Sequence, residues 1–150
     1  MPKNIIFVYK ISFKKYLSAY SNISDTDLDK IASLEIDSSF DYEKDEMYYC
    51  YVITSKIEID KYKKILEKNF INYTCENISN LLLQNEYDIT YIKDYIDNDN
   101  FYLYDVFMED LNKWLYENLD IDTILDIISF KGINSLRPVD KKFLKDNHEK

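Results

Sequence analysis

The chain has 150 residues, of which 46% are hydrophobic and 16% aromatic, a composition that favours one folded domain spanning residues 1–150. Its 28 acidic and 19 basic residues give a formal charge of −9, which argues against direct binding of nucleic acid or of anionic membranes. No apolar run reaches the roughly 20 residues of a membrane span, and the lysine-interrupted start does not resemble a signal peptide. We therefore expect a cytoplasmic protein with reduced cysteines.

The first half of the chain mixes strand and helix patterns. Residues 4–11 are β-branched and aromatic and predict a strand. A short helical stripe follows it, formed by Phe13, Tyr16, Leu17 and Tyr20. Residues 24–27 resemble a capping box that opens the next helix. Residues 47–54 are almost entirely apolar, which predicts a central strand covered on both faces.

The second half is mainly helical. A helical stripe runs from residue 59 to residue 70, residues 73–78 predict a third strand, and residues 78–96 suit short helices. Longer stripes at residues 104–119 and 121–128 predict two further helices, with Trp114 buried in the first and Asp120 or Asp122 capping the second. The expected fold is α+β, a small sheet with a predominantly helical C-terminal half; an all-α fold is the alternative.

The chain has a single glycine, Gly132, so few turns at positive φ are expected. Gly132 follows the stripe of residues 121–128, where it would end that helix, and Pro138 fits the first turn of the next one. The sequence therefore predicts a helical hairpin at the C-terminus.

Residues 123–144, TILDIISFKGINSLRPVDKKFL, are similar to a short C-terminal element with the pattern I-L-D-K-I-x-x-x-G-x-x-S-L-T-x-E-E-K-x-F-L. That element occurs in assorted proteins of the Bacteroidota, including rhomboid-like membrane proteins. Arg137 and Val139 depart from it, where the pattern prefers a capping Thr or Ser and an acid. The resemblance covers about a seventh of the chain; it implies a local hairpin and carries over no catalytic residue.

Few residues suggest catalysis. The only histidine, His148, lies near the C-terminus, so nucleophilic catalysis has no evident base. Cys50 lies in the most apolar segment and reads as a buried hydrophobe, and it faces Cys75 only if their strands are neighbours. The sequence offers no zinc cluster, no phosphate-binding loop and no complete calcium loop. We predict no catalytic residue, no cofactor and no metal ligand.

Residues 37–46, DSSFDYEKDE, hold five acids with two aromatics and show no evident apolar periodicity, which predicts an exposed loop. A solvated loop is one interpretation of this segment. The other is a surface for a basic protein partner, with Tyr42 as the aromatic anchor and with these acids around it: Asp37, Asp41, Glu43, Asp45 and Glu46.

The leading hypothesis for function is a non-catalytic interaction protein with an acidic surface, for example an immunity protein or another inhibitor of a basic partner. The alternatives are a metal-dependent hydrolase or nuclease that uses carboxylates, and an acidic scaffold or subunit without an inhibitory role.

Overall fold

The computed structural model describes residues 5–14, 23–96 and 98–147 and confirms the α+β class. Its centre is an antiparallel sheet with the strand order β2-β3-β1-β4. The strands are β1 (Ile6–Lys14), β2 (Ile36–Lys44), β3 (Met47–Ser55) and β4 (Tyr73–Asn77). The strands predicted near residues 4–11, 47–54 and 73–78 are confirmed, and the apolar β3 lies inside the sheet as expected. The all-α alternative is wrong.

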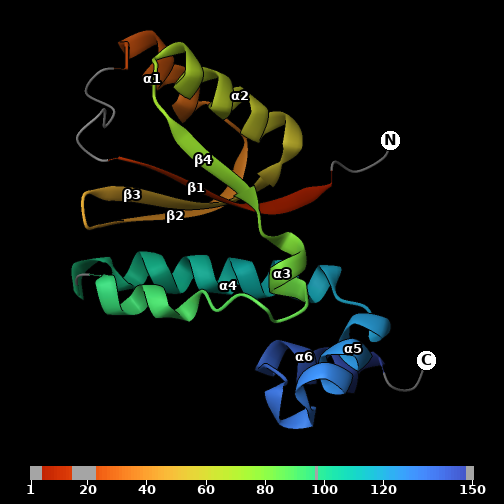
Figure 1. Ribbon diagram of the computed structural model, residues 1–150. Helices are drawn as coiled ribbons and strands as arrows, with labels where there is room; N and C mark the ends of the chain where they lie inside the picture. Colours follow the sequence, from red (N-terminus) through yellow and green to blue (C-terminus); the bar gives the residue numbers. More distant parts are fainter. Residues whose placement is uncertain (1–4, 15–22, 97, 148–150) are drawn as a thin grey trace.

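Helices cover both faces of the sheet (Figure 1). On one face lie α1 (Asp25–Ala32) and α2 (Lys56–Lys68), and on the other lie α3 (Ser79–Leu83), the 3₁₀ helices η3 (Thr90–Tyr95) and η4 (Asn98–Asn100), and α4 (Phe101–Asn118). The C-terminal hairpin consists of α5 (Ile121–Lys131), the 3₁₀ helix η5 (Ile133–Ser135) and α6 (Pro138–Asn147). It lies beyond the end of α4 (Figure 1).

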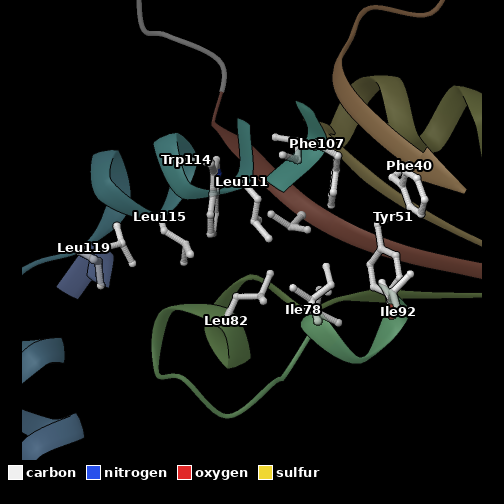
Figure 2. Close-up of a cluster of buried hydrophobic side chains, with 14 of the residues drawn as sticks. Phe40, Tyr51, Ile78, Leu82, Ile92, Phe107, Leu111, Trp114, Leu115 and Leu119 are labelled. Carbon is white, nitrogen blue, oxygen red and sulfur yellow. The ribbon is translucent and has the colours of Figure 1, made fainter. Parts of the chain in front are cut away.

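Alternating side chains of the strands divide the core into two clusters. Tyr9, Ile11 and Val52 face α1 and α2 and pack against a stripe of α2 formed by Ile59, Tyr62 and Leu66. Val8, Tyr51 and Ile53 point to the opposite face and join a larger cluster with α3, α4 and the C-terminal hairpin. Figure 2 shows four α4 residues of that cluster, Phe107, Leu111, Trp114 and Leu115, together with Leu119, which directly follows the helix.

Trp114 is buried, as predicted, with 6% of its surface exposed. Its indole Nε1–H donates a hydrogen bond of 2.9 Å to the carbonyl oxygen of Ile6 at the start of β1. The side chain therefore fixes α4 against the sheet both by apolar contact and by one polar contact.

The helix expected after the first strand does not begin at Phe13. That residue belongs to β1, which continues to Lys14, and its ring is buried beside Tyr48 of β3. Tyr16, Leu17 and Tyr20 lie outside the described residues. The spacing of Phe13 relative to the later residues was compatible with a helix, but pairing with β3 extends the strand through this position.

Helix α1 begins as predicted, because the Ser24 hydroxyl accepts a hydrogen bond of 3.2 Å from the backbone N–H of Asp27. The Asp27 side chain is itself buried and accepts hydrogen bonds from Lys68 and Asn69 at the end of α2. The hydrogen bond from Asn69 holds the pKa of Asp27 below its usual value, and the ammonium of Lys68 adds to this effect. Asp27 therefore ties the start of α1 to the end of α2.

This contact gives the fold a pH dependence that Asp27→Asn is expected to remove. Because the pKa of Asp27 is lower in the folded chain than its value of about 3.9 in the unfolded one, the unfolded chain binds more protons between these two values. The ionised form stabilises the fold above this window, and the stabilisation disappears as the pH falls through the folded pKa. Urea unfolding from pH 7 to pH 2 should show the variant less stable at neutral pH and the difference shrinking below about pH 4. A constant difference across that range would contradict the assignment.

The expectation of few turns at positive φ is wrong. Asp45, Glu46, Phe70 and Asn85 have φ values of 51°, 67°, 59° and 56°. Asp and Asn tolerate this region better than most side chains do. Phe70 follows α2, where the N–H of Ile71 reaches back to the carbonyl of Leu66 at 2.9 Å, and its ring is 94% exposed. The chain thus makes several turns without glycine.

Gly132 ends α5, as predicted, with its N–H donating to the Ile128 carbonyl at 2.8 Å. Its φ of 87° is positive, but its ψ of 159° places it in the extended region that only glycine adopts readily, and not in the left-handed helical region. An added Cβ would meet no heavy atom within 4 Å, so a side chain here strains only the backbone.

Gly132→Val is therefore expected to lower the free energy of unfolding by about 1–3 kcal/mol, purely through this backbone conformation. Urea unfolding followed by circular dichroism measures the change, and Asn134→Ala in the adjacent exposed turn serves as the control. An unchanged midpoint for Gly132→Val would refute this explanation.

Arg137 and Val139 both have structural roles in the C-terminal hairpin. The backbone N–H of Arg137 donates a hydrogen bond of 2.9 Å to the Asp140 carboxylate. An acid inside α6 therefore accepts the backbone hydrogen bond of the residue that precedes this helix. The Arg137 guanidinium binds the same carboxylate through two nitrogens and also donates to the carbonyls of Leu82 and Leu83. Val139 is buried in the larger cluster.

Candidate protein-binding surface

The acidic segment of residues 37–46 is not a loop, as the sequence predicted, but the edge strand β2 and the turn after it. Its Phe40 and Tyr42 point into the larger core cluster, while Asp41 between them and Glu43 after them are exposed. This period of two is the ordinary pattern of a strand with one covered face. Asp45 and Glu46 form the two-residue connection to β3 with both φ values positive, which suits the twist of a hairpin.

Tyr42 cannot serve as the exposed aromatic anchor that the sequence suggested, because only 8% of its surface is accessible. Its ring stacks on those of Tyr49 and Tyr51 in β3, with ring centres 5.1 Å and 6.5 Å away. The expectation failed because residue type and local charge do not reveal that α4 and η3 cover this face of β2. Tyr42 supports the strand from inside.

The five predicted acids are all exposed, but they do not lie on one face. Asp37 is the extra residue of a β-bulge, since Ile36 pairs with Thr54 and Ser38 with Ile53. Asp41 lies on the α1–α2 face, where its carboxylate accepts a hydrogen bond of 2.5 Å from the Tyr48 hydroxyl. The remaining predicted acids follow along the strand and its turn: Glu43, Asp45 and Glu46.

Asp37 meets acids from a distant part of the chain in a groove between the sheet and α4. The groove has a volume of about 820 Å³. It is lined by Ile5, Ile6, Asp37, Ser38, Ile53, Asp110, Lys113, Trp114, Glu117 and Asn118. The Ser38 hydroxyl donates a hydrogen bond of 2.7 Å to the Asp110 carboxylate and links β2 to α4 across it. We call this feature the α4 groove; three carboxylates and one lysine line it, so its charge favours cations.

A second polar feature, which the sequence analysis missed, is a cluster of phenols beneath β2 and β3. The Tyr51 hydroxyl lies 2.7 Å from that of Tyr87 and 3.1 Å from that of Tyr91, and the Tyr42 hydroxyl lies 3.3 Å from that of Tyr91. The ammonium of Lys10 lies 5.9 Å from the centre of the Tyr87 ring. We call the four tyrosine side chains the tyrosine cluster: Tyr42, Tyr51, Tyr87 and Tyr91.

The members of the tyrosine cluster differ in acidity. Burial raises the pKa values of Tyr42 and Tyr51 well above the usual one for a phenol. Burial acts on Tyr91 in the same direction, but hydrogen bonds from Tyr42 and Tyr51 and the charge of Lys10 outweigh it, so the pKa of Tyr91 is lowered. Tyr91 is also the cluster member whose exposure reaches 36%, so a negative charge on its oxygen is both hydrogen-bonded and close to water.

Tyr91 is therefore expected to ionise before the other phenols of the cluster. Absorbance at 295 nm during an alkaline titration should show a tyrosine phase below pH 10 in the native protein, and Tyr91→Phe should remove that phase. Tyr51→Phe should shift it upward by removing one donor, whereas Tyr102→Phe on the outer side of α4 should leave it in place. Retention of the early phase in Tyr91→Phe would show that another residue causes it.

Cys50 and Cys75 lie too far apart to act together. Ile11 of β1 pairs with Cys50 of β3 on one side and with Cys75 of β4 on the other, so the two cysteines lie two strand spacings apart, about 9.5 Å. A disulfide needs a shorter separation, and both thiols are free. Burial raises the pKa of Cys50 to about 12, which makes it a poor nucleophile at neutral pH.

Within residues 5–14, 23–96 and 98–147, no group of three or more His, Cys, Asp or Glu side chains is arranged to hold a metal ion. His148 lies outside these ranges. Over the same part of the chain, no helix combines the length and the apolar character needed to cross a membrane.

Comparisons with known proteins do not supply a family. No protein-family model, no curated protein and no solved structure matches the chain. The resemblance of residues 123–144 to an element of Bacteroidota proteins therefore stays a prediction, and the function has to be inferred from the surface itself.

Proposed function

We propose that this chain is a non-catalytic, cytoplasmic interaction protein that binds a basic protein partner through β2, its turn and the α4 groove. The observation that carries the proposal is the sorting of side chains on β2, where Phe40 and Tyr42 are buried and every acid is exposed. The strand is thus held by the core, while the strand and its turn together expose five carboxylates: Asp37, Asp41 and Glu43 on the strand, and Asp45 and Glu46 in the turn.

The electrostatics of the whole chain support such a partner. The formal charge of −9 attracts basic proteins over distances of about 8–10 Å at physiological ionic strength and speeds their encounter. At the end of β2, Asp37 joins Asp110 and Glu117 in the α4 groove, which has room for a lysine or arginine side chain. An inhibitor or immunity protein that occupies the basic surface of a toxin is one specific form of this function.

The experiment compares two variants with the same net charge. The test variant neutralises the five β2 and turn acids: Asp37→Asn, Asp41→Asn, Glu43→Gln, Asp45→Asn and Glu46→Gln. The control neutralises five exposed acids on other elements: Asp29→Asn, Asp94→Asn, Asp105→Asn, Asp122→Asn and Asp126→Asn. The partner is obtained by affinity capture on the wild-type protein from the native cells, and association rates are measured by stopped flow from 20 mM to 500 mM salt.

The test variant is expected to associate about tenfold or more slowly than the control at low salt, with a flatter salt dependence. Because both variants lose the same charge, a difference between them reports the position of the acids and not the net charge alone. Equal rates for the two variants, or a captured partner with an acidic surface, would overturn the proposed function.

A further inference from the structure

The outer edge of β2 has no strand partner in the part of the chain that the structure describes. The sheet order places β2 at one end, and its nine residues pair with β3 on one side only. The backbone N–H and C=O groups that an edge strand directs away from its neighbour can bond to an added strand. This is a long edge, since it spans the whole of β2.

The register identifies the residues whose backbone points outward. Lys44 and Met47 flank the two-residue turn, so they form a hydrogen-bonded pair, and such pairs alternate with non-hydrogen-bonded ones along an antiparallel ladder. Lys44, Tyr42, Phe40 and Ser38 therefore direct their backbone groups toward β3. The groups of the residues between them point to the outer edge: Glu43, Asp41 and Ser39.

We propose that the outer edge of β2 binds an extended basic segment of the partner by strand addition. This inference rests on the proposed function and specifies how the partner binds. Backbone hydrogen bonds to Ser39 and Asp41 supply the attachment, and the neighbouring side chains select its charge.

The two faces of β2 call for different side chains on the added strand. The side chains of Ser39, Asp41 and Glu43 share the face of their partners in β3, which contribute to the smaller cluster: Val52, Cys50 and Tyr48. Residues of an added strand on this face lie beside carboxylates, so lysine or arginine fits there. On the opposite face they lie beside Phe40 and Tyr42 of the larger cluster, so apolar residues fit there. The segment therefore alternates basic and apolar residues.

The same acids disfavour a second copy of this chain as the occupant. Pairing of two β2 edges would place Asp41 and Glu43 opposite or diagonal to their own counterparts, and like charges at such positions are destabilising. A basic segment instead finds opposite charges at each of these positions. The edge thus discriminates between a copy of itself and a basic partner.

The test uses a nine-residue peptide of alternating lysine and valine, which matches the length of β2. An alternating glutamate–valine peptide is the control for charge. Hydrogen exchange by NMR is expected to show that the amides of Ser39 and Asp41 exchange readily in the free protein and become at least about tenfold slower with the lysine peptide. The amides of Phe40 and Tyr42 are protected from the start, because they already bond to β3.

A matched pair of variants tests the same point without a change of charge. Ser39→Pro removes one outward N–H from an edge position that tolerates proline, while Ser39→Ala removes only the hydroxyl. Ser39→Pro should weaken binding of the peptide about fivefold relative to Ser39→Ala, with unchanged circular dichroism for both. If the proline variant does not fold, the exchange measurement on the wild-type protein still tests strand addition.

Two outcomes overturn strand addition. One is binding of the lysine peptide without protection of the Ser39 and Asp41 amides, which leaves the proposed acidic surface intact but removes the backbone contribution. The other is no binding of the lysine peptide at all. Failure of the proposed function is recognised separately, by equal association rates of the native partner with the two five-fold neutral variants.

Discussion

Arg137→Ala is expected to lower the free energy of unfolding by about 3–5 kcal/mol, because it leaves a buried carboxylate without its countercharge. The Asp140 side chain is fully buried and receives two nitrogens of the Arg137 guanidinium at 2.9 Å and 3.0 Å. The same guanidinium satisfies the carbonyls of Leu82 and Leu83 at the end of α3. One side chain thus connects α6 to α3, and its loss leaves three groups with fewer partners than in the native fold.

Urea unfolding at pH 7, followed by far-UV circular dichroism, measures this effect. Arg137→Lys should lose nearly as much stability as Arg137→Ala, because an ammonium cannot reproduce the planar fork that reaches the carboxylate and the carbonyls together. Lys141→Ala, an exposed change on the same helix, is the control and should stay within about 0.5 kcal/mol of the wild type. If Arg137→Lys has the same free energy of unfolding as the wild type, the positive charge alone, and not the geometry of the guanidinium, holds the hairpin.

Trp114→Ala is expected to cost a similar amount, about 3–5 kcal/mol, through the cavity that it leaves between α4 and the sheet. The indole is 6% exposed and lies among Leu111, Leu115 and the start of β1 (Figure 2). Its removal also leaves the Ile6 carbonyl without the indole donor.

Trp114→Phe separates these two contributions. It keeps most of the apolar volume and loses the hydrogen bond to Ile6, so its loss of stability should fall clearly below that of Trp114→Ala. Tyr102→Ala serves as the control, since this aromatic side chain of the same helix is 75% exposed. If Trp114→Ala unfolds at the same urea concentration as this control, α4 does not depend on Trp114 for its attachment.

Much of the fold was predictable, because several segments carry a pattern that allows one structure only. β3 is apolar at nearly every position, and such a strand is stable only between other strands with both faces covered. The capped starts of α1 at Ser24 and of α5 at Asp120 are set by side-chain hydrogen bonds to residues three positions along the chain. Local chemistry decides these features, so a local interpretation of the sequence finds them.

The strand β2 was missed because its signals are weak individually. Phe40 and Tyr42 do alternate with polar residues, but only two apolar side chains mark the covered face, and the bulge at Asp37 interrupts the alternation before them. The turn gives no warning either, since Asp45 and Glu46 occupy positions where Asn and Gly are typical. Pairing with the strongly apolar β3 is what makes this segment a strand.

The candidate surface was predictable in its charges but not in its geometry. Exposure of the five acids follows from their residue type, whereas the burial of Tyr42 depends on α4 and η3, more than 45 residues further along the chain. The tyrosine cluster likewise joins residues 42, 51, 87 and 91, and no local pattern relates them. The acids of the α4 groove were missed for the same reason, since Asp110 and Glu117 meet Asp37 only through tertiary contacts.

The division of the core into two clusters affects how the protein can be made. A ribosome produces the chain from its N-terminus, and among the described residues the cluster under α1 and α2 contains none after Cys75. The opposite face of the same sheet, with Val8, Tyr51 and Ile53, is covered only after α4 has been synthesised. When the ribosome has just completed β4, the cluster under α1 and α2 can already form, but the opposite face of the sheet is still an exposed apolar surface. Chaperones recognise such surfaces, and incomplete chains aggregate through them.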